Sequence, residues 1–186
     1  QCGMGRPGEL FAHGQVKPDV VALAKALGCG FPIGAMLAGP KVADTMQYGS
    51  HGTTFGGNPM AAAVARVALA KLASPAILAN VERQANDLRA GLARINQQLA
   101  LFDEVRGRGL MIGAVLADAY KGRAGDILDH AAARGLLLLQ AGADVLRFVP
   151  PLSITDEELA EGLSRLHHAL NDFVAGGKPA TDRSGP

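Results

Sequence analysis

The chain has 186 residues, of which 48% are hydrophobic and 19% charged, a composition typical of a globular protein with a buried core. Its 18 Lys and Arg residues nearly balance 17 Asp and Glu residues, and aromatic residues make up only 4%. The small net charge and the shortage of stacking side chains argue against a nucleic-acid partner and against binding to an anionic membrane.

The two cysteines, Cys2 and Cys29, form no CxxC motif and no metal-ligand spacing. This usage indicates a reducing compartment, so we expect a cytoplasmic protein without a metal site. No apolar stretch reaches the roughly 20 residues that cross a bilayer, and no membrane partner is expected. The chain starts at Gln1 rather than at Met, and residues 1–8 resemble a loop. This opening predicts a truncated product or a fragment of a longer protein.

Two short apolar runs predict strands in the first third of the chain. Residues 20–24 form a continuous apolar run, typical of a strand buried on both faces of a parallel sheet that helices cover. Residues 33–38 predict a second strand. Lys25 lies between the two runs and precedes a Gly-rich loop, and residues 48–57 form a second loop rich in glycine.

Two helix starts follow. Asn58 and Pro59 predict an N-cap and a first helical residue, for a helix that runs to about Leu72. Ser74 and Pro75 repeat the signal for a longer helix. Its apolar stripe has helical spacing and consists of Val81, Ala85, Leu88, Leu92 and Ile95.

The second half mixes strands and helices. Residues 110–116 predict a strand, and a helix over 126–134 ends at Gly135 as its C-terminal cap. The apolar runs 136–140 and 145–152 predict two more strands.

A capping box of Thr155 and Glu158 starts the last helix. Its stripe consists of Leu159, Leu163, Leu166, Leu170 and Phe173. We expect three parts: residues 1–74 from the end of a large α/β domain, a small α/β domain over 75–175, and a flexible tail over 176–186.

Lys25 is the first candidate for chemistry. Burial at the end of an apolar strand would favour its neutral amine, which can attack a carbonyl and form a Schiff base. By position alone, however, a lysine at a strand end more often extends into solvent.

Two further groups could bind anions. Thr53 and Thr54, with the glycines that follow them before a helix start, could receive a phosphate, although such a loop can equally be an ordinary helix cap. Arg147 interrupts an apolar strand, so it either points to water or binds a carboxylate. Arg106 to Gly109 could meet an anion but are more typical of a tight turn, and His167-His168 are typical of a solvated helix face.

Taken in order, five segments resemble one family. QCGMGRPGELFA, PDVVALAKALGCGFPIGAMLAG, HGTTFGGNP, RGRGLMIG and LRFVPPLSIT are similar to segments of the ornithine and acetylornithine aminotransferases, within the class-III aminotransferases. The resemblance covers the chain to about Val174 and is greatest to enzymes acting on acetylornithine or succinylornithine. It implies the C-terminal half of a fold-type-I α/β transferase that uses pyridoxal 5'-phosphate (PLP) and forms a cytoplasmic homodimer with a shared active site.

The resemblance also implies roles for single residues. Lys25 corresponds to the lysine that bonds covalently to the cofactor, and Gln1 to a residue beside the cofactor's phenolic oxygen. Thr54 corresponds to the threonine that binds the cofactor phosphate across the dimer interface, and Thr53 to a neighbouring substrate position. Arg147 corresponds to the arginine that binds a substrate α-carboxylate. The implied reaction is PLP-dependent transamination between N-acetylornithine, succinylornithine or ornithine and 2-oxoglutarate, in arginine biosynthesis.

The chain departs from the family pattern at a few points. Cys29 stands where the family usually has a glycine, and the chain is two residues shorter after Ala12. The aspartate that pairs with the pyridine nitrogen in the family precedes the position of Gln1. Without that aspartate the cofactor is a weak electron sink, and half of the parent sheet is absent. We therefore expect this chain alone to be inactive and poorly soluble.

Three other functions compete with this hypothesis. The first is another ω-amino-acid aminotransferase, acting on ornithine, γ-aminobutyrate or succinyldiaminopimelate. The second is a non-catalytic fragment that serves only in dimerisation. The third is a Schiff-base lyase that uses Lys25 without the cofactor, a hypothesis that leaves the HGTT loop without a purpose.

Overall fold

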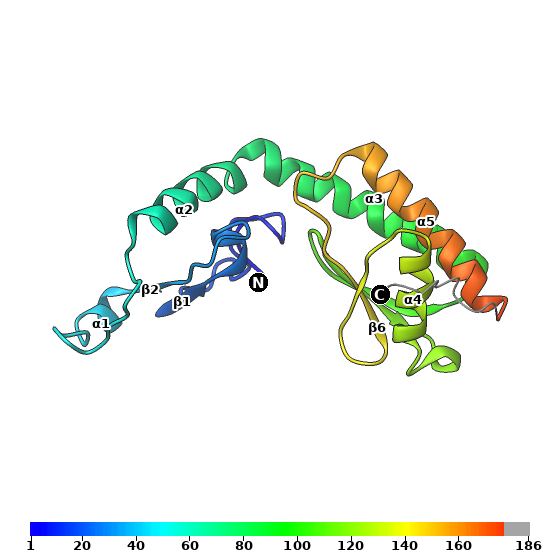
Figure 1. Ribbon diagram of the computed structural model, residues 1–186, viewed down its shortest axis with the longest axis horizontal. Helices are drawn as coiled ribbons and strands as arrows, with labels where there is room; N and C mark the ends of the chain where they lie inside the picture. The colour runs from blue at the N-terminus through cyan, green and yellow to red at the C-terminus, as the bar shows by residue number, and fades with distance from the viewer. Residues whose placement is uncertain (177–186) are drawn as a thin grey trace, which may run out of the picture. The chain divides into compact units, whose positions relative to one another are not determined.

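The computed structural model describes residues 1–176 and divides into two compact units (Figure 1). The first unit is Gln1–Ala79, and the second begins at Asn80. The division falls inside helix α3 (Pro75–Leu99). The assignment of these parts to a large and a small domain stays a prediction, and the predicted tail lies outside the described residues from position 177 on.

The first unit contains a two-stranded ribbon. Strand β1 (Val20–Leu23) pairs antiparallel with β2 (Ala35–Ala38), and Val20 lies opposite Ala38. Both predicted strands are therefore confirmed. Within the described residues, however, β1 is not buried on both faces and has no parallel neighbour, contrary to what its apolar run predicts. Its side chains alternate between exposed and half-buried, because two strands alone cannot cover either face of a sheet.

Short helical elements complete the first unit. A 3₁₀ turn, η1 (Lys25–Leu27), follows β1, and a single helical turn, α1 (Pro40–Ala43), follows β2. Helix α2 (Pro59–Leu72) starts and ends where the sequence predicts. The Asn58 side chain accepts a hydrogen bond from the backbone N–H of Ala61 at 2.8 Å, which confirms the predicted N-cap.

The second unit is built on a four-stranded antiparallel sheet. The strand order is β3 (Phe102–Arg108), β4 (Met111–Leu116), β6 (Val145–Phe148) and β5 (Leu139–Gln140). The sequence predicts only three of these strands. It misses β3 because this edge strand is mostly charged and exposed, without an apolar run. The tight turn predicted over Arg106 to Gly109 begins later than expected: Arg106, Gly107 and Arg108 belong to β3, and the turn consists of Gly109 and Leu110.

Three helices form the rest of the second unit. Helix α3, with α4 (Ala124–Ala133) and α5 (Asp156–Val174), covers one face of the sheet, and α3 and α5 lie side by side (Figure 1). A 3₁₀ turn, η2 (Asp118–Tyr120), leads from β4 to α4. The predicted stripes of α3 and α5 form the core, apart from half-buried Leu163. The buried strand residues beneath them are Phe102, Ile112, Ala114, Leu116, Leu146 and Phe148.

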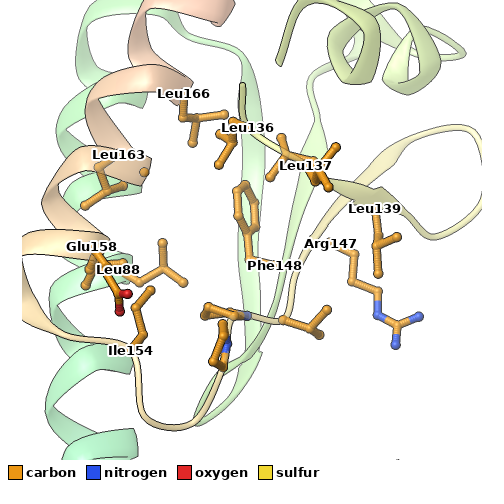
Figure 2. Close-up of a pocket in the computed structure, with 16 residues that line it drawn as sticks. Leu88, Leu136, Leu137, Leu139, Arg147, Phe148, Ile154, Glu158, Leu163 and Leu166 are labelled. Carbon is orange, nitrogen blue, oxygen red and sulfur yellow. The ribbon is translucent and has the colours of Figure 1, made fainter. Parts of the chain in front are cut away.

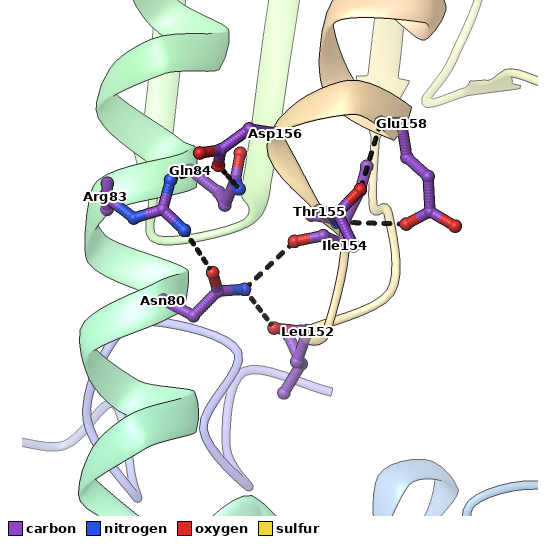
Figure 3. Close-up of polar contacts among 8 residues, drawn as sticks. All are labelled: Asn80, Arg83, Gln84, Leu152, Ile154, Thr155, Asp156 and Glu158. Atoms are coloured by element: carbon purple, nitrogen blue, oxygen red, sulfur yellow. Dashed lines mark hydrogen bonds and ion pairs between the residues drawn. The ribbon is translucent and has the colours of Figure 1, made fainter.

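A polar network joins α3 to the start of α5 (Figure 3). Gln84, which is fully buried, donates a hydrogen bond to the Asp156 carboxylate at 2.6 Å, and Arg83 forms an ion pair with the same carboxylate. Asn80 donates to the backbone carbonyls of Leu152 and Ile154 at 2.9 and 3.1 Å. These contacts hold the first turn of α5 against α3.

The predicted capping box is present at the start of α5. The Thr155 hydroxyl accepts a hydrogen bond from the Glu158 N–H at 3.2 Å, and the Glu158 carboxylate accepts one from the Thr155 N–H at 2.9 Å. The reciprocal pair satisfies backbone groups that the helix itself leaves without partners.

Within residues 1–176, no single helix combines the length and apolar character needed to span a membrane. Helices α2 and α3 meet these criteria only when taken together as a bent pair.

Candidate active site

Lys25 is separated from strand β1 by Ala24 alone and takes the first position of η1. Its backbone φ is 48°, in the left-handed region that non-glycine residues seldom occupy. Such a conformation costs about 1–2 kcal/mol, and strained residues of this kind are concentrated at functional sites. The sequence predicts the lysine at the strand end but carries no signal for its backbone conformation.

The Lys25 amine contacts the N-terminal residue of the chain. Its Nζ donates a hydrogen bond to the amide oxygen of Gln1 at 2.8 Å. The opening segment is held in place by an isolated antiparallel β-bridge between Gly3 and Phe11 and by the burial of the Met4 side chain. The structure thus brings together two of the predicted site residues, which are 24 positions apart.

The sequence predicts that Lys25 is buried, but the described residues leave its side chain exposed to solvent. Lys25 is exposed, as are the neighbouring Ala24 and Cys29, while Leu27 and Gly28 are buried beneath the turn. The cause is the same as for β1: a two-stranded ribbon has no further layer to cover its end.

Thr53 and Thr54 lie in the loop before helix α2, and both are exposed. A Cβ at Gly56 would meet the Thr53 methyl at 2.2 Å, so any larger residue there would have to displace the Thr53 side chain. Gly57 has a φ of 71°, and nothing lies within 4 Å of the place a Cβ would take. The loop therefore presents two hydroxyls beside open backbone at the start of a 14-residue helix.

Arg147 lies in β6 of the second unit and is half-buried. Its Nε is buried without a hydrogen-bond partner, and no carboxylate within residues 1–176 forms an ion pair with it. An unpaired buried donor on a charged group is costly, because desolvation is not compensated. The residue is therefore prepared to bind an anion, which favours the carboxylate interpretation over a side chain that simply points to water.

A cavity of about 240 Å³ lies next to Arg147 (Figure 2). Leucines and prolines from 136–139, 149–151 and α5 line most of it. The Phe148 side chain points toward Leu163 and Leu166, whereas Arg147 points away from them. Arg147 therefore stands at the border of an apolar cavity rather than inside it.

The five predicted site residues thus fall into three groups. Lys25 and Gln1 are in contact, Thr53 and Thr54 share one loop of the same unit, and Arg147 belongs to the second unit. Within the part of the chain that the structure describes, no group of three or more His, Cys, Asp or Glu side chains could hold a metal ion.

A family model for the class-III aminotransferases matches residues 1–170. The chain belongs to this family. A class-III aminotransferase from Xanthomonas campestris pv. campestris, an acetylornithine aminotransferase, is 70% identical over 177 residues, which are 94% of this chain and 43% of the relative. The chain thus spans less than half the length of the curated relatives it matches.

Solved class-III aminotransferases have the same fold. The N-acetylornithine aminotransferase of Stenotrophomonas maltophilia K279a superposes with a TM-score of 0.88 at 66% identity, over 95% of this chain and 46% of that one. An ornithine aminotransferase of Toxoplasma gondii, whose structure reveals partial occupancy of PLP at its active site, has a TM-score of 0.85 at 34% identity over 94% and 43%. These likenesses confirm the predicted fold-type-I α/β class and imply PLP as the family's cofactor.

Proposed function

We propose that this chain contributes the lysine and carboxylate-binding parts of a PLP-dependent aminotransferase. Its amino donor is N-acetylornithine or a close ω-amino relative, and its acceptor is 2-oxoglutarate. The observation that carries the proposal is the 2.8 Å contact between the Lys25 amine and the Gln1 amide, in a chain whose family uses such a lysine.

The residues present fit the cofactor. The Lys25 amine has a polar partner in Gln1 but forms no ion pair with a carboxylate within residues 1–176. No ion pair therefore has to break before this amine reacts with the cofactor aldehyde. The Thr53–Thr54 loop offers hydroxyls and open backbone for a phosphate at the start of α2. Lys25 would hold the cofactor covalently, Gln1 would lie beside its phenolic oxygen, and Thr54 would bind its phosphate from the partner subunit of a homodimer.

When bound, PLP acts as an electron sink for the bond that breaks at the substrate carbon. This chain's own groups supply position and proton transfer. The Lys25 amine, at the end of β1, would move the proton, while Arg147 would fix the substrate carboxylate through its planar guanidinium. Thr53 would contact the substrate next to the phosphate. The cytoplasmic location and the place in arginine biosynthesis belong to the same proposal.

A trapping experiment tests the role of Lys25 on the chain itself. The chain is incubated with PLP and reduced with borohydride, and peptide mapping then locates the modified lysine. Lys17, Lys41, Lys71, Lys121 and Lys178 serve as internal competitors. We expect preferential labelling of Lys25, and Thr54→Val should lower that labelling without changing the labelling of Lys121. Equal modification of Lys17, Lys25 and Lys41 would contradict the assignment.

A substrate panel separates the related activities. The test protein is a chimera of full family length, which joins the N-terminal part of the X. campestris relative to this chain. We expect the highest kcat/KM with N-acetylornithine and 2-oxoglutarate, and ping-pong kinetics because both half-reactions share one site. A preference for γ-aminobutyrate would favour another ω-amino-acid aminotransferase. A complete lack of transamination, with Lys25 unlabelled as well, would favour a non-catalytic scaffold.

A further inference from the structure

The loop that carries Thr53 and Thr54 is not held by the packing of its side chains. Residues 51–57 are all exposed, and the Phe55 side chain is 81% exposed. Within the described part of the chain, no hydrogen bond holds either threonine hydroxyl. Hydrogen bonds to the backbone must therefore fix the shape of this loop. The one inside it, from the Gly56 N–H to the Thr53 carbonyl, is long at 3.4 Å.

The Asn58 side chain ties this loop to the start of helix α2. Its Nδ2 donates a hydrogen bond to the Phe55 carbonyl at 2.9 Å, while its Oδ1 accepts one from the Ala61 N–H at 2.8 Å. The two ends of one amide thus hold the loop and the first turn of the helix at a fixed separation. Asn58 is half-buried, so water competes less for its amide than for the exposed groups of the loop.

The start of α2 offers few backbone donors to a phosphate. Its first residue, Pro59, has no N–H. The N–H groups of Ala61 and Ala62 already bond to Asn58, the first to its side chain and the second to its carbonyl. In the first turn only the Met60 N–H has no partner among the described residues. A phosphate bound here must therefore rely on the loop, and the loop has to be held in position.

We propose that Asn58 is a positioning residue for the phosphate loop: the hydrogen bond from its Nδ2 to the Phe55 carbonyl keeps the Thr54 hydroxyl where it meets a phosphate. The inference rests on the proposed function, in which Thr54 binds the phosphate of PLP. It gives one side chain two separate roles, since the Oδ1 caps the helix and the Nδ2 holds the loop. Asn58 itself makes no contact with the cofactor.

Two substitutions separate these roles. Asn58→Ser keeps a cap, because a serine hydroxyl also accepts a hydrogen bond from a helix N–H, but its shorter side chain loses the bond to the Phe55 carbonyl. Asn58→Ala removes both. Hydrogen exchange of the Ala61 amide reports on the cap, and it should stay slow in Asn58→Ser and become faster in Asn58→Ala.

The measurement compares two aldehydes, PLP and pyridoxal, of which the second lacks the phosphate. The 186-residue chain is titrated with each, at a high chain concentration so that two copies can share the site, and is then reduced with borohydride. Peptide mapping gives the aldehyde concentration at which half of Lys25 is labelled. We expect wild type to prefer PLP. Asn58→Ser should raise the PLP concentration about three- to tenfold, the effect of one lost hydrogen bond, and leave the pyridoxal concentration unchanged.

Asn96→Ser is the matched control, because Asn96 uses its amide in the same way in the second unit. It donates to the Phe102 carbonyl and accepts from the Phe102 N–H, both at 2.7 Å. This variant should keep the wild-type preference for PLP. The inference is wrong if Asn58→Ser is labelled like wild type, or if its labelling by PLP and pyridoxal weakens equally. It is also wrong if labelling by PLP falls only in variants that lose the slow exchange of Ala61, since the cap alone would then explain the effect.

Failure of the proposed function gives a different result. If neither aldehyde labels Lys25 in wild type, the proposed function fails and this inference fails with it. If both aldehydes label wild type at the same concentration, the role of Lys25 stands, but the phosphate role of Thr54 and the positioning role of Asn58 are both wrong.

Discussion

The two compact units differ in how far they bury their apolar side chains. The largest fully buried side chains, such as Leu92, Ile112 and Ile127, all lie in the second unit. The first unit buries few large apolar residues, among them Met4 and Leu27. Most of the exposed large hydrophobic residues in the described part of the chain belong to it: Val16, Val20, Met36, Leu37, Tyr48, Phe55, Met60, Val67 and Leu69. Local signals thus suffice to form helices and strands in both units, but only the second unit also closes a core of its own.

The largest expected difference in the free energy of unfolding comes from a Leu→Ala substitution made in each unit. Leu92→Ala, at a fully buried position of α3, should lower the free energy of unfolding of the second unit by about 2–5 kcal/mol. Leu69→Ala, on the exposed side of α2, should change stability by about 0.5 kcal/mol or less. Urea unfolding followed by the helical circular dichroism measures both variants, and the fluorescence of Tyr120, whose ring lies 5.7 Å from Phe173, reports separately on the second unit. Equal costs at the two positions would show that the units do not differ in packing.

Two glycines of positive φ sharpen the comparison. Gly107 in β3 has a φ of 126°, and a Cβ there would meet the Met111 carbonyl oxygen at 2.0 Å. Gly107→Ala should therefore cost about 2 kcal/mol or more, from strain and overlap together. Gly57→Ala has open space around its Cβ and should cost about 1 kcal/mol, from strain alone. Thermal unfolding of both variants checks the order, and a Gly57 cost equal to that of Gly107 would contradict the close backbone approach in the hairpin.

The pH dependence of the second unit should depend on Asp156. The hydrogen bond from Arg83 holds the pKa of this carboxyl below its usual value of 3.8, so its contribution to stability is present above that value. The contribution is lost as the pH falls through the lower pKa of the folded state. Wild type should therefore be more stable than Asp156→Asn at neutral pH, and the difference should shrink below about pH 4. Urea unfolding between about pH 7 and pH 3 measures it, and Arg83→Gln should weaken the trend.

A stabilising substitution is expected in the turn after Lys25. Cys29 has a φ of 46°, and its thiol, a weak donor, donates a hydrogen bond to the Ala26 carbonyl at 3.4 Å. Cys29→Gly should relieve about 1 kcal/mol of backbone strain. Slower hydrogen exchange of the Leu27 and Gly28 amides, which close this turn, would report the gain. Faster exchange would mean that the cysteine side chain stabilises the turn despite its conformation.

The residues of the candidate site could be named from the sequence, because each of them stands in a recognisable motif. Lys25, Thr54 and Arg147 stand in segments that resemble the family, and the family match confirms that resemblance. The contact of Lys25 with Gln1 was not predictable, because it joins segments that lie far apart in the sequence. The hydrogen bond from Asn58 to the Phe55 carbonyl was not predictable either, because the cap signal specifies only the oxygen end of the amide. Their roles stay proposals that the experiments above decide.

By itself, the sequence determined the helix caps, the apolar stripes and the fold class, since these depend on neighbours within a few residues or on motif order. The Asn58 cap and the Thr155 capping box are examples. Only the tertiary structure decided that β3 joins the sheet, that Lys25 takes a left-handed φ without being covered, and that its amine meets Gln1. Strand register and burial depend on which distant segments pair, and no local periodicity encodes that choice.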